Sequence, residues 1–95
     1  MKLVTVIYDR SIGNRITEIL KKQNISGYTK ILDAQGFGGT GHKMGTAIWP
    51  GTNNILLIAL PDDQVESLVK AIRDFQSTFR QNPGITIFVQ PVEVK

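Results

Sequence analysis

A glycine-rich stretch is the part of this sequence best suited to bind a ligand. Residues 36–52 read GFGGTGHKMGTAIWPGT and hold six of the nine glycines of the chain. Glycine tolerates positive φ and close approach, so successive N–H groups over residues 36–41 would form an anion-binding concavity. The spacing matches neither a Walker A motif nor a dinucleotide-binding GxGxxG that opens a helix. We expect a small anion as the guest, and a flexible loop tip without a ligand is the alternative.

The other residues capable of chemistry give weaker signals. His42 is the single histidine, and without cysteine or an adjacent acidic cluster it suits a loop hydrogen bond better than a metal site. A metal role would need a symmetry axis that gathers several copies. Asp62 and Asp63 are explained as helix-capping residues, and no candidate nucleophile is accompanied by a base. We therefore expect a protein that is not an enzyme.

Length and composition restrict the class of protein further. The 95 residues predict one domain, of a size that often completes its core by oligomerising. The formal charge of +3 is scattered without a basic run, so nucleic acid is not an expected partner. The absence of cysteine fits a reducing compartment, and no apolar run is long enough to cross a bilayer. We expect a cytoplasmic protein.

The apolar pattern alternates between strand and helix periods along the chain. Nearly continuous apolar runs predict two buried strands, a mixed run predicts an exposed edge strand, and i, i+3, i+4 spacing predicts two amphipathic helices. The expected elements are strands at 3–8, 28–34, 54–60 and 85–89, a helix at 11–23, and a helix that begins at Asp62 or Asp63 and is followed by a loop at 77–84. The order is therefore βαββαβ.

Helix-terminal residues support these bounds. Ser11 or Asp9 is available as the N-cap of the first helix, and Gly27 follows shortly after its end. Asp63 with Glu66 three residues later fits a capping box for the second helix.

The βαββαβ order predicts an α+β, ferredoxin-like fold, because right-handed crossovers place both helices on one face of a four-stranded antiparallel sheet. In the strand order 4-1-3-2, the two most apolar strands are central, while the second strand carries Lys30 and Asp33 and the fourth is followed by Pro91. Apolar side chains of the central strands cannot all face the helices. We therefore expect an oligomer that covers the other face.

Motifs spread over nearly the whole chain resemble the PII signal-transduction proteins. They are GFG at 36–38 with GH at 41–42, LPDD at 60–63 opening the second helix, ISGYT at 25–29 entering the second strand, and IFV at 87–89 in the last strand. The resemblance implies a trimer in which a nucleotide, usually ATP or ADP, lies in each cleft between subunits. It also implies that residues 36–52 are a T-loop, which changes shape with the ligand and docks on a membrane transporter, enzyme or regulator.

The resemblance assigns roles to individual residues. Those expected to bind the nucleotide are Thr29, Gly36, Phe37, Gly38, Gly39, Thr40, Ala59 and Arg80. Those expected to contact the partner are His42, Lys43, Met44 and Trp49. Trp49 is either a packing anchor for the loop base or an exposed docking residue.

Departures from the family pattern predict a divergent PII-like protein. The T-loop is shorter and lacks the tyrosine used for uridylylation, and Gly39 and Thr40 stand where the family has arginine and glutamine. The sequence STFRQNPG at 77–84 replaces the phosphate cradle TGxxGDGK, and no pair of arginines follows the last strand. These changes leave open whether ATP, ADP or AMP binds. The alternatives are a metal-ion responsive trimer without nucleotide and, less favoured, a small ferredoxin-like enzyme or RNA-binding domain.

Overall fold

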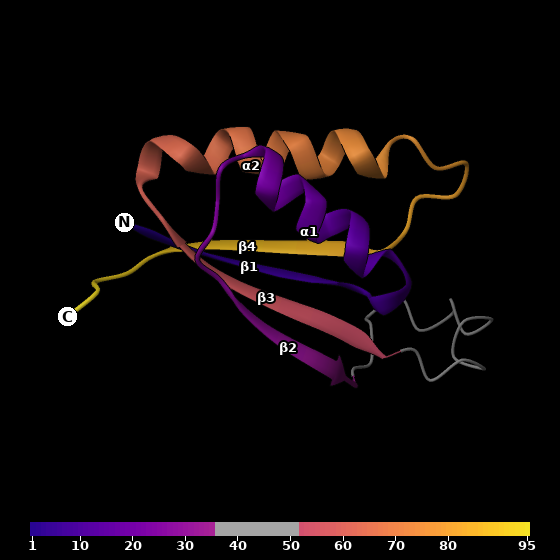
Figure 1. Cartoon of the computed structure of the whole chain (residues 1–95), viewed down its shortest axis with the longest axis horizontal. Helices are drawn as coiled ribbons and strands as arrows, with labels where there is room; N and C mark the ends of the chain where they lie inside the picture. The colour runs from indigo at the N-terminus through magenta and orange to yellow at the C-terminus, as the bar shows by residue number, and fades with distance from the viewer. Residues whose placement is uncertain (36–51) are drawn as a thin grey trace.

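The computed structural model describes residues 1–35 and 52–95, and its elements follow the predicted βαββαβ order (Figure 1). They are β1 (Lys2–Asp9), the short 3-10 helix η1 (Arg10–Ile12), α1 (Gly13–Lys22), β2 (Thr29–Ala34), β3 (Asn53–Leu60), α2 (Asp62–Gln76) and β4 (Ile85–Pro91). The first helix differs from the prediction only at its start, because a 3-10 turn precedes the α-helix.

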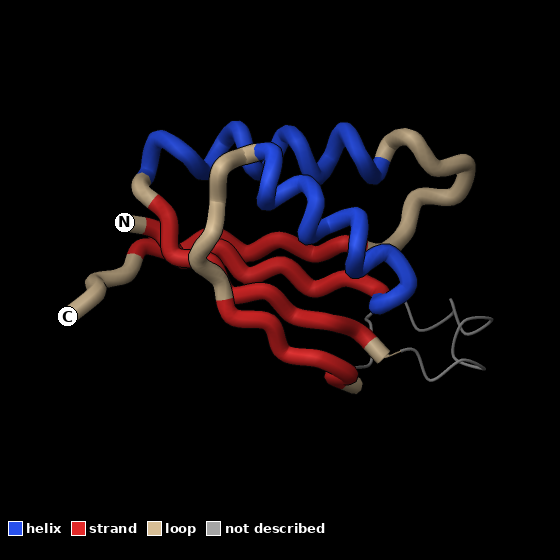
Figure 2. The backbone as a smooth tube through the Cα atoms, viewed as in Figure 1, coloured by secondary structure: helices blue, strands red, loops and turns tan. Residues whose placement is uncertain are grey.

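The described strands form one antiparallel sheet in the order β2-β3-β1-β4. The two most apolar strands, β1 and β3, are central, and the mixed strand β2 lies at an edge, as predicted. Both helices cover the same face of the sheet (Figure 2). The predicted ferredoxin-like α+β fold and its strand order are therefore confirmed.

A single core lies between the helices and the sheet. Every second residue of the central strands points toward the helices and is buried, as period-two alternation requires. The core side chains are Val4, Val6 and Tyr8 of β1, Leu56, Ile58 and Leu60 of β3, Ile16 and Leu20 of α1, Val65, Leu68, Ile72 and Phe75 of α2, and Ile12, Ile25 and Ile85 from η1, the loop after α1 and β4. Each aliphatic side chain of this kind contributes about 1.5–3 kcal/mol by leaving water. Neither described helix is long and apolar enough to cross a bilayer.

The ends of the helices differ from two predictions. Asp9 does cap η1, since its Oδ1 accepts a hydrogen bond from Ser11 N at 2.8 Å. The predicted capping box of Asp63 and Glu66 is wrong, because the N-cap of α2 is Pro61 and makes no side-chain cap. The left-handed residue after α1 is Asn24, with φ of 60°, and not Gly27.

Asp62 is engaged elsewhere, which explains why it does not cap α2. Its Oδ1 lies 2.9 Å from the amino nitrogen of Met1, and its Oδ2 lies 4.0 Å from Lys2 Nζ. The hydrogen bond from the Met1 amino group lowers the pKa of Asp62. Both acids of the first turn still favour α2, because negative charge is stabilised near a helix N-terminus.

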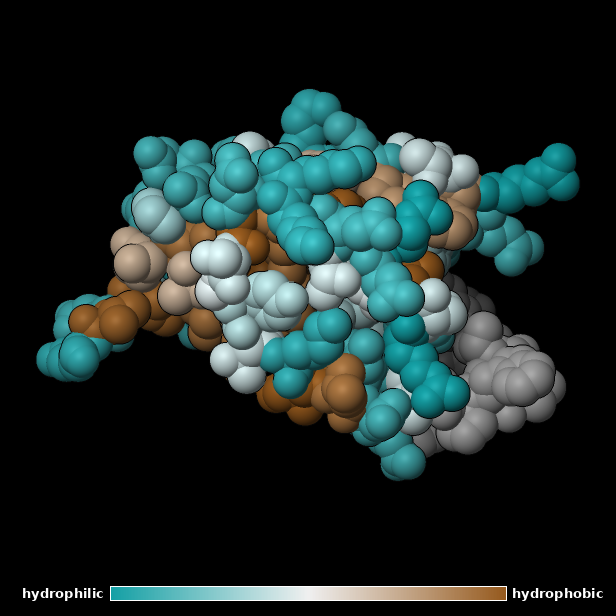
Figure 3. All heavy atoms as spheres, in the orientation of Figure 1, coloured by the Kyte–Doolittle hydropathy of each residue, from teal (hydrophilic) through white to brown (hydrophobic). Residues whose placement is uncertain are grey.

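No described element covers the opposite face of the sheet, which is largely apolar. Three cross-strand rows make it up: Ile31, Ile55, Ile7 and Thr86; Thr29, Leu57, Thr5 and Phe88; and Ala59, Leu3 and Gln90. Phe88 is 55% exposed and Ile31 is 43% exposed. In the view of Figure 3, hydrophilic residues gather over α2 and hydrophobic ones near the edge formed by β2. We call the three rows the open face.

Tyr8 is an exception within the core, because it buries a polar atom. The residue is 0% exposed, and its hydroxyl makes no hydrogen bond of ordinary geometry to the described residues. Burial raises the pKa of the Tyr8 phenol, the side chain of Asn54 partly lowers it, and Tyr28 raises it further. The native state therefore favours the protonated phenol.

We expect the substitution Tyr8→Phe to stabilise the fold by about 1 kcal/mol at neutral pH, because it removes a buried hydroxyl without a good partner. The raised pKa also means that wild-type stability is fully present below the unfolded-state value of about 10 and falls as the pH rises above it. Tyr8→Phe has no phenol at this position to ionise, so its free energy of unfolding should not show this part of the decrease above pH 10. Urea unfolding at pH 7 and above pH 10 measures both effects.

The exposed Tyr28 provides the matched control at pH 7, where both phenols are protonated and Tyr28→Phe should leave the free energy of unfolding nearly unchanged. A loss of stability in Tyr8→Phe at neutral pH would contradict the prediction and indicate a paired hydroxyl.

Candidate functional site

The strand ends next to residues 36–51 form the candidate functional site. β1 and β2 stop at this end of the sheet, β3 begins there, and the 77–84 loop enters β4 at the same end (Figure 1). The residue after β1 is bonded here to the residue before β3, because Arg10 N donates a hydrogen bond to Thr52 O at 3.3 Å. The site therefore lies where the glycine-rich stretch leaves and rejoins the described fold.

A β-bulge shapes the end of β2. Ile31 pairs with Ile55 and Ala34 pairs with Asn53, so β2 has one more residue than β3 between these pairs. Asp33 in the bulge is left-handed, with φ of 58°, a conformation that aspartate tolerates better than most residues.

A buried amide holds this bulge in place. Asn54 is 6% exposed and points to the helix side, and its Oδ1 accepts a hydrogen bond from Asp33 N at 3.3 Å. The Asn54 amide nitrogen also packs close to Gly13, where an added Cβ would lie 3.3 Å from it. Asn54 thus connects the bulge with the first residue of α1. A buried polar group that is paired in this way specifies one local geometry.

An ion pair lies at the surface of the same site. Arg10 Nη1 is 3.5 Å from Asp33 Oδ1, and the two side chains are 66% and 60% exposed. At this exposure the pair contributes only about 0–1 kcal/mol to stability. The guanidinium has five N–H donors, so a single carboxylate contact leaves most of them available. The arrangement can present positive charge to an anion.

The structure places the predicted nucleotide residues in two groups. Thr29 and Ala59 lie on the open face, where Thr29 pairs with Leu57 and Ala59 stands two residues further along β3. Arg80 is exposed in the 77–84 loop. Thr29 is level with Leu57, four residues from Asn53, and Ala59 is six residues from Asn53, so along β3 they lie about 13 and about 20 Å from the strand ends of the same chain. One copy does not bring the groups together.

The remaining predicted residues lie outside the described residues. They are Gly36, Phe37, Gly38, Gly39 and Thr40 of the nucleotide group, and His42, Lys43, Met44 and Trp49 of the partner group. Among residues 1–35 and 52–95, no group of three or more side chains is placed to hold a metal ion. The metal role of His42 therefore stays untested.

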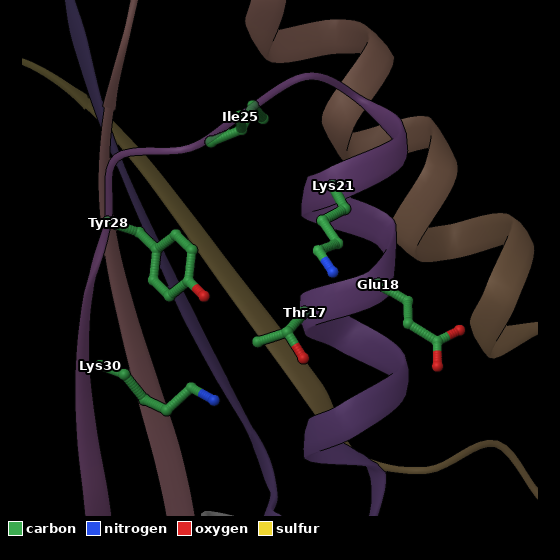
Figure 4. A pocket seen from close by; sticks show the side chains of 6 residues that line it. All are labelled: Thr17, Glu18, Lys21, Ile25, Tyr28 and Lys30. Carbon is green, nitrogen blue, oxygen red and sulfur yellow. The ribbon is translucent and has the colours of Figure 1, made fainter.

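A shallow hollow of about 290 Å³ lies between α1 and β2 (Figure 4). Its lining consists of Thr17, Glu18, Lys21, Ile25, Tyr28 and Lys30. Lys21 and Lys30 reach toward the space from opposite elements, but both are exposed, and the acidic Glu18 also belongs to the lining. An anion there would keep much of its own water, and exposed charges attract weakly. This hollow is therefore a poorer candidate than the strand ends.

Sequence reasoning missed Arg10 and Asn54. For Asn54 a signal exists, because counting back from the buried Leu60, Ile58 and Leu56 by twos reaches Asn54 on the helix side. For Arg10 none exists, because its partners Asp33 and Thr52 are distant in sequence and meet only in the folded sheet.

Comparison with solved structures supports this architecture. CPII, a nitrogen regulatory PII-like protein from Thiomonas intermedia K12 in a structure bound to ADP, AMP and bicarbonate, is 17% identical with a TM-score of 0.68. That comparison covers 99% of this chain and 93% of the other. A PII-like signaling protein from Thermus thermophilus is 20% identical with a TM-score of 0.68 over 94% of this chain and 82% of that one. At such identities the likeness establishes the fold.

The apo form of CPII gives a similar result, with a TM-score of 0.65 and 16% identity over 96% of this chain and 89% of that chain. Comparison with curated proteins found no matching sequence. The family model described as Nitrogen regulatory protein P-II matches residues 1–94. This chain therefore belongs to the P-II family, as the resemblance in its motifs predicted, and it is a divergent PII-like member.

Proposed function

We propose that this protein is a trimeric PII-like regulator that binds an adenine nucleotide in the clefts between its subunits. The placement of the predicted nucleotide residues carries the proposal. Thr29 and Ala59 lie on the open face, while Arg80 and the strand ends beside residues 36–51 lie at one end of the sheet. A second copy that brings its open face to these strand ends would place both groups around one nucleotide. The binding of ADP and AMP by CPII supports an adenine nucleotide.

The open face provides the contact surface for the trimer. Leu57 lies in its central row, between Thr29 and Thr5. Exposed apolar area of this kind is unfavourable in water by about 25 cal/mol per Å², and a second copy is the simplest cover. Assembly would therefore cover the open face and form the ligand cleft at the same time.

Regulation would proceed by a shift in population. A ligand at the strand ends restricts residues 36–52, and a partner such as a membrane transporter or an enzyme recognises the restricted form. His42, Lys43, Met44 and Trp49 are the residues we assign to the partner, with Trp49 as an aromatic anchor. The protein acts in the cytoplasm as a single domain of residues 1–95 and catalyses no reaction itself.

Calorimetric titration tests nucleotide binding. We expect AMP, ADP or ATP to bind the trimer saturably, with one site for each cleft, because each cleft joins the two groups of residues. GMP and GDP are the controls and should bind at least about tenfold more weakly if contacts to the adenine ring contribute a typical 1.4 kcal/mol. A folded trimer that binds no adenine nucleotide would refute the proposal.

Light scattering after size exclusion tests the trimer. We expect wild type at three times the chain mass of 10.5 kDa and the variant Leu57→Lys at the mass of a monomer, because a buried charge without a partner opposes assembly. Gln64→Lys adds the same charge on the exposed side of α2 and should remain a trimer. A monomeric wild type, or a trimeric Leu57→Lys, would contradict this assembly.

A further inference from the structure

We propose that Arg10 binds the phosphate of the nucleotide, and that it does so by exchanging the carboxylate of Asp33 for the phosphate. This inference rests on the proposed function and identifies a residue that determines its specificity. Arg10 would supply positive charge from the residue that directly follows β1.

The position of Arg10 is fixed by the fold. It follows β1 directly, and its backbone N–H is bonded to Thr52 O at 3.3 Å. The guanidinium lies 3.5 Å from Asp33 at the end of β2. One residue therefore touches both chain segments that flank residues 36–51, and an anion held between these segments would lie within its reach.

The backbone of Asp33, which carries the carboxylate paired with Arg10, is held in place. Asp33 is fixed in the bulge by its hydrogen bond to the buried Asn54. This constraint fixes the backbone of Asp33 beside Arg10, so the weak pair forms at a defined position near the strand ends.

Exchange of the carboxylate for a phosphate is favourable on chemical grounds. The existing pair is exposed and long, so breaking it costs little. A phosphate oxygen pair matches the guanidinium fork with two parallel hydrogen bonds, and a phosphate carries more negative charge than a carboxylate. A neutral nucleoside offers neither advantage. Arg10 should therefore favour nucleotides over nucleosides.

The test compares the binding of ADP and adenosine to wild type and variants by calorimetry. Arg10→Gln should weaken ADP binding about tenfold to a hundredfold, which is the range for a charge-assisted hydrogen bond, and should leave adenosine binding unchanged. Asp33→Asn should strengthen ADP binding about two- to fivefold, because it removes the competing carboxylate. Arg10→Lys should lie between wild type and Arg10→Gln.

Lys22→Gln is the matched control, since it removes one exposed positive charge from the far end of α1. It should leave the affinity for ADP within about twofold of wild type, because a charge beyond the screening length acts weakly on the ligand. If wild type binds ADP and Arg10→Gln binds it equally well, the role of Arg10 is overturned while the proposed function stands. Weaker ADP binding by Asp33→Asn would overturn the exchange, because the carboxylate would then assist the ligand.

If wild type binds no nucleotide, the proposed function fails separately, and inorganic pyrophosphate becomes the probe. The NMR signal of the Arg10 Nε–Hε group is assigned by its loss in Arg10→Gln. A saturable shift of this signal with pyrophosphate, equal in wild type and Lys22→Gln, would still support an anion site at Arg10. An unchanged Arg10 signal in a folded protein would overturn it.

Discussion

The apolar character of both faces of the sheet is the constraint on which the rest of the molecule depends. β1 and β3 carry apolar side chains on both faces of the sheet, yet α1 and α2 cover one face only. The covered face forms the core, and the open face retains partly exposed side chains such as Leu57 and Phe88. Because apolar burial is the main favourable contribution to folding, the open face favours association. In the trimer that we propose, fold, assembly and ligand cleft would be linked through one sheet.

The apolar layer changes to a polar one where the sheet meets the candidate site. Tyr8 and Asn54 face each other across β1 and β3, at the last helix-facing positions before the strand ends. An apolar residue at position 54 could fill the volume, but it could not accept the hydrogen bond from Asp33 that fixes the bulge. The close approach of Asn54 to Gly13 extends the same constraint to α1. Local polar pairing here determines geometry, while burial elsewhere determines stability.

The sequence predicts the elements well because each depends on a local period. The alternation in β1 and β3 and the apolar stripes of the helices are readable within single windows, and right-handed crossovers then leave one topology. Helix capping was less predictable, because Asp62 has a competing partner in Met1, which only the fold brings near. Arg10 was missed for the same reason, since its contacts join the ends of three strands. The roles of residues 36–51 remain predictions from sequence.

The strength of the Arg10–Asp33 pair limits what this contact alone can regulate. A ligand shifts a conformational equilibrium only by the difference in its affinity for the two states. Loss of the exposed pair itself, of about 0–1 kcal/mol, shifts such an equilibrium by at most about fivefold. A larger response must come from the contacts that the ligand forms, including the one with Arg10, or from several equivalent sites acting in one assembly. A trimer closed over the open face would provide such sites, so burial of the open face and ligand binding at Arg10 would be coupled.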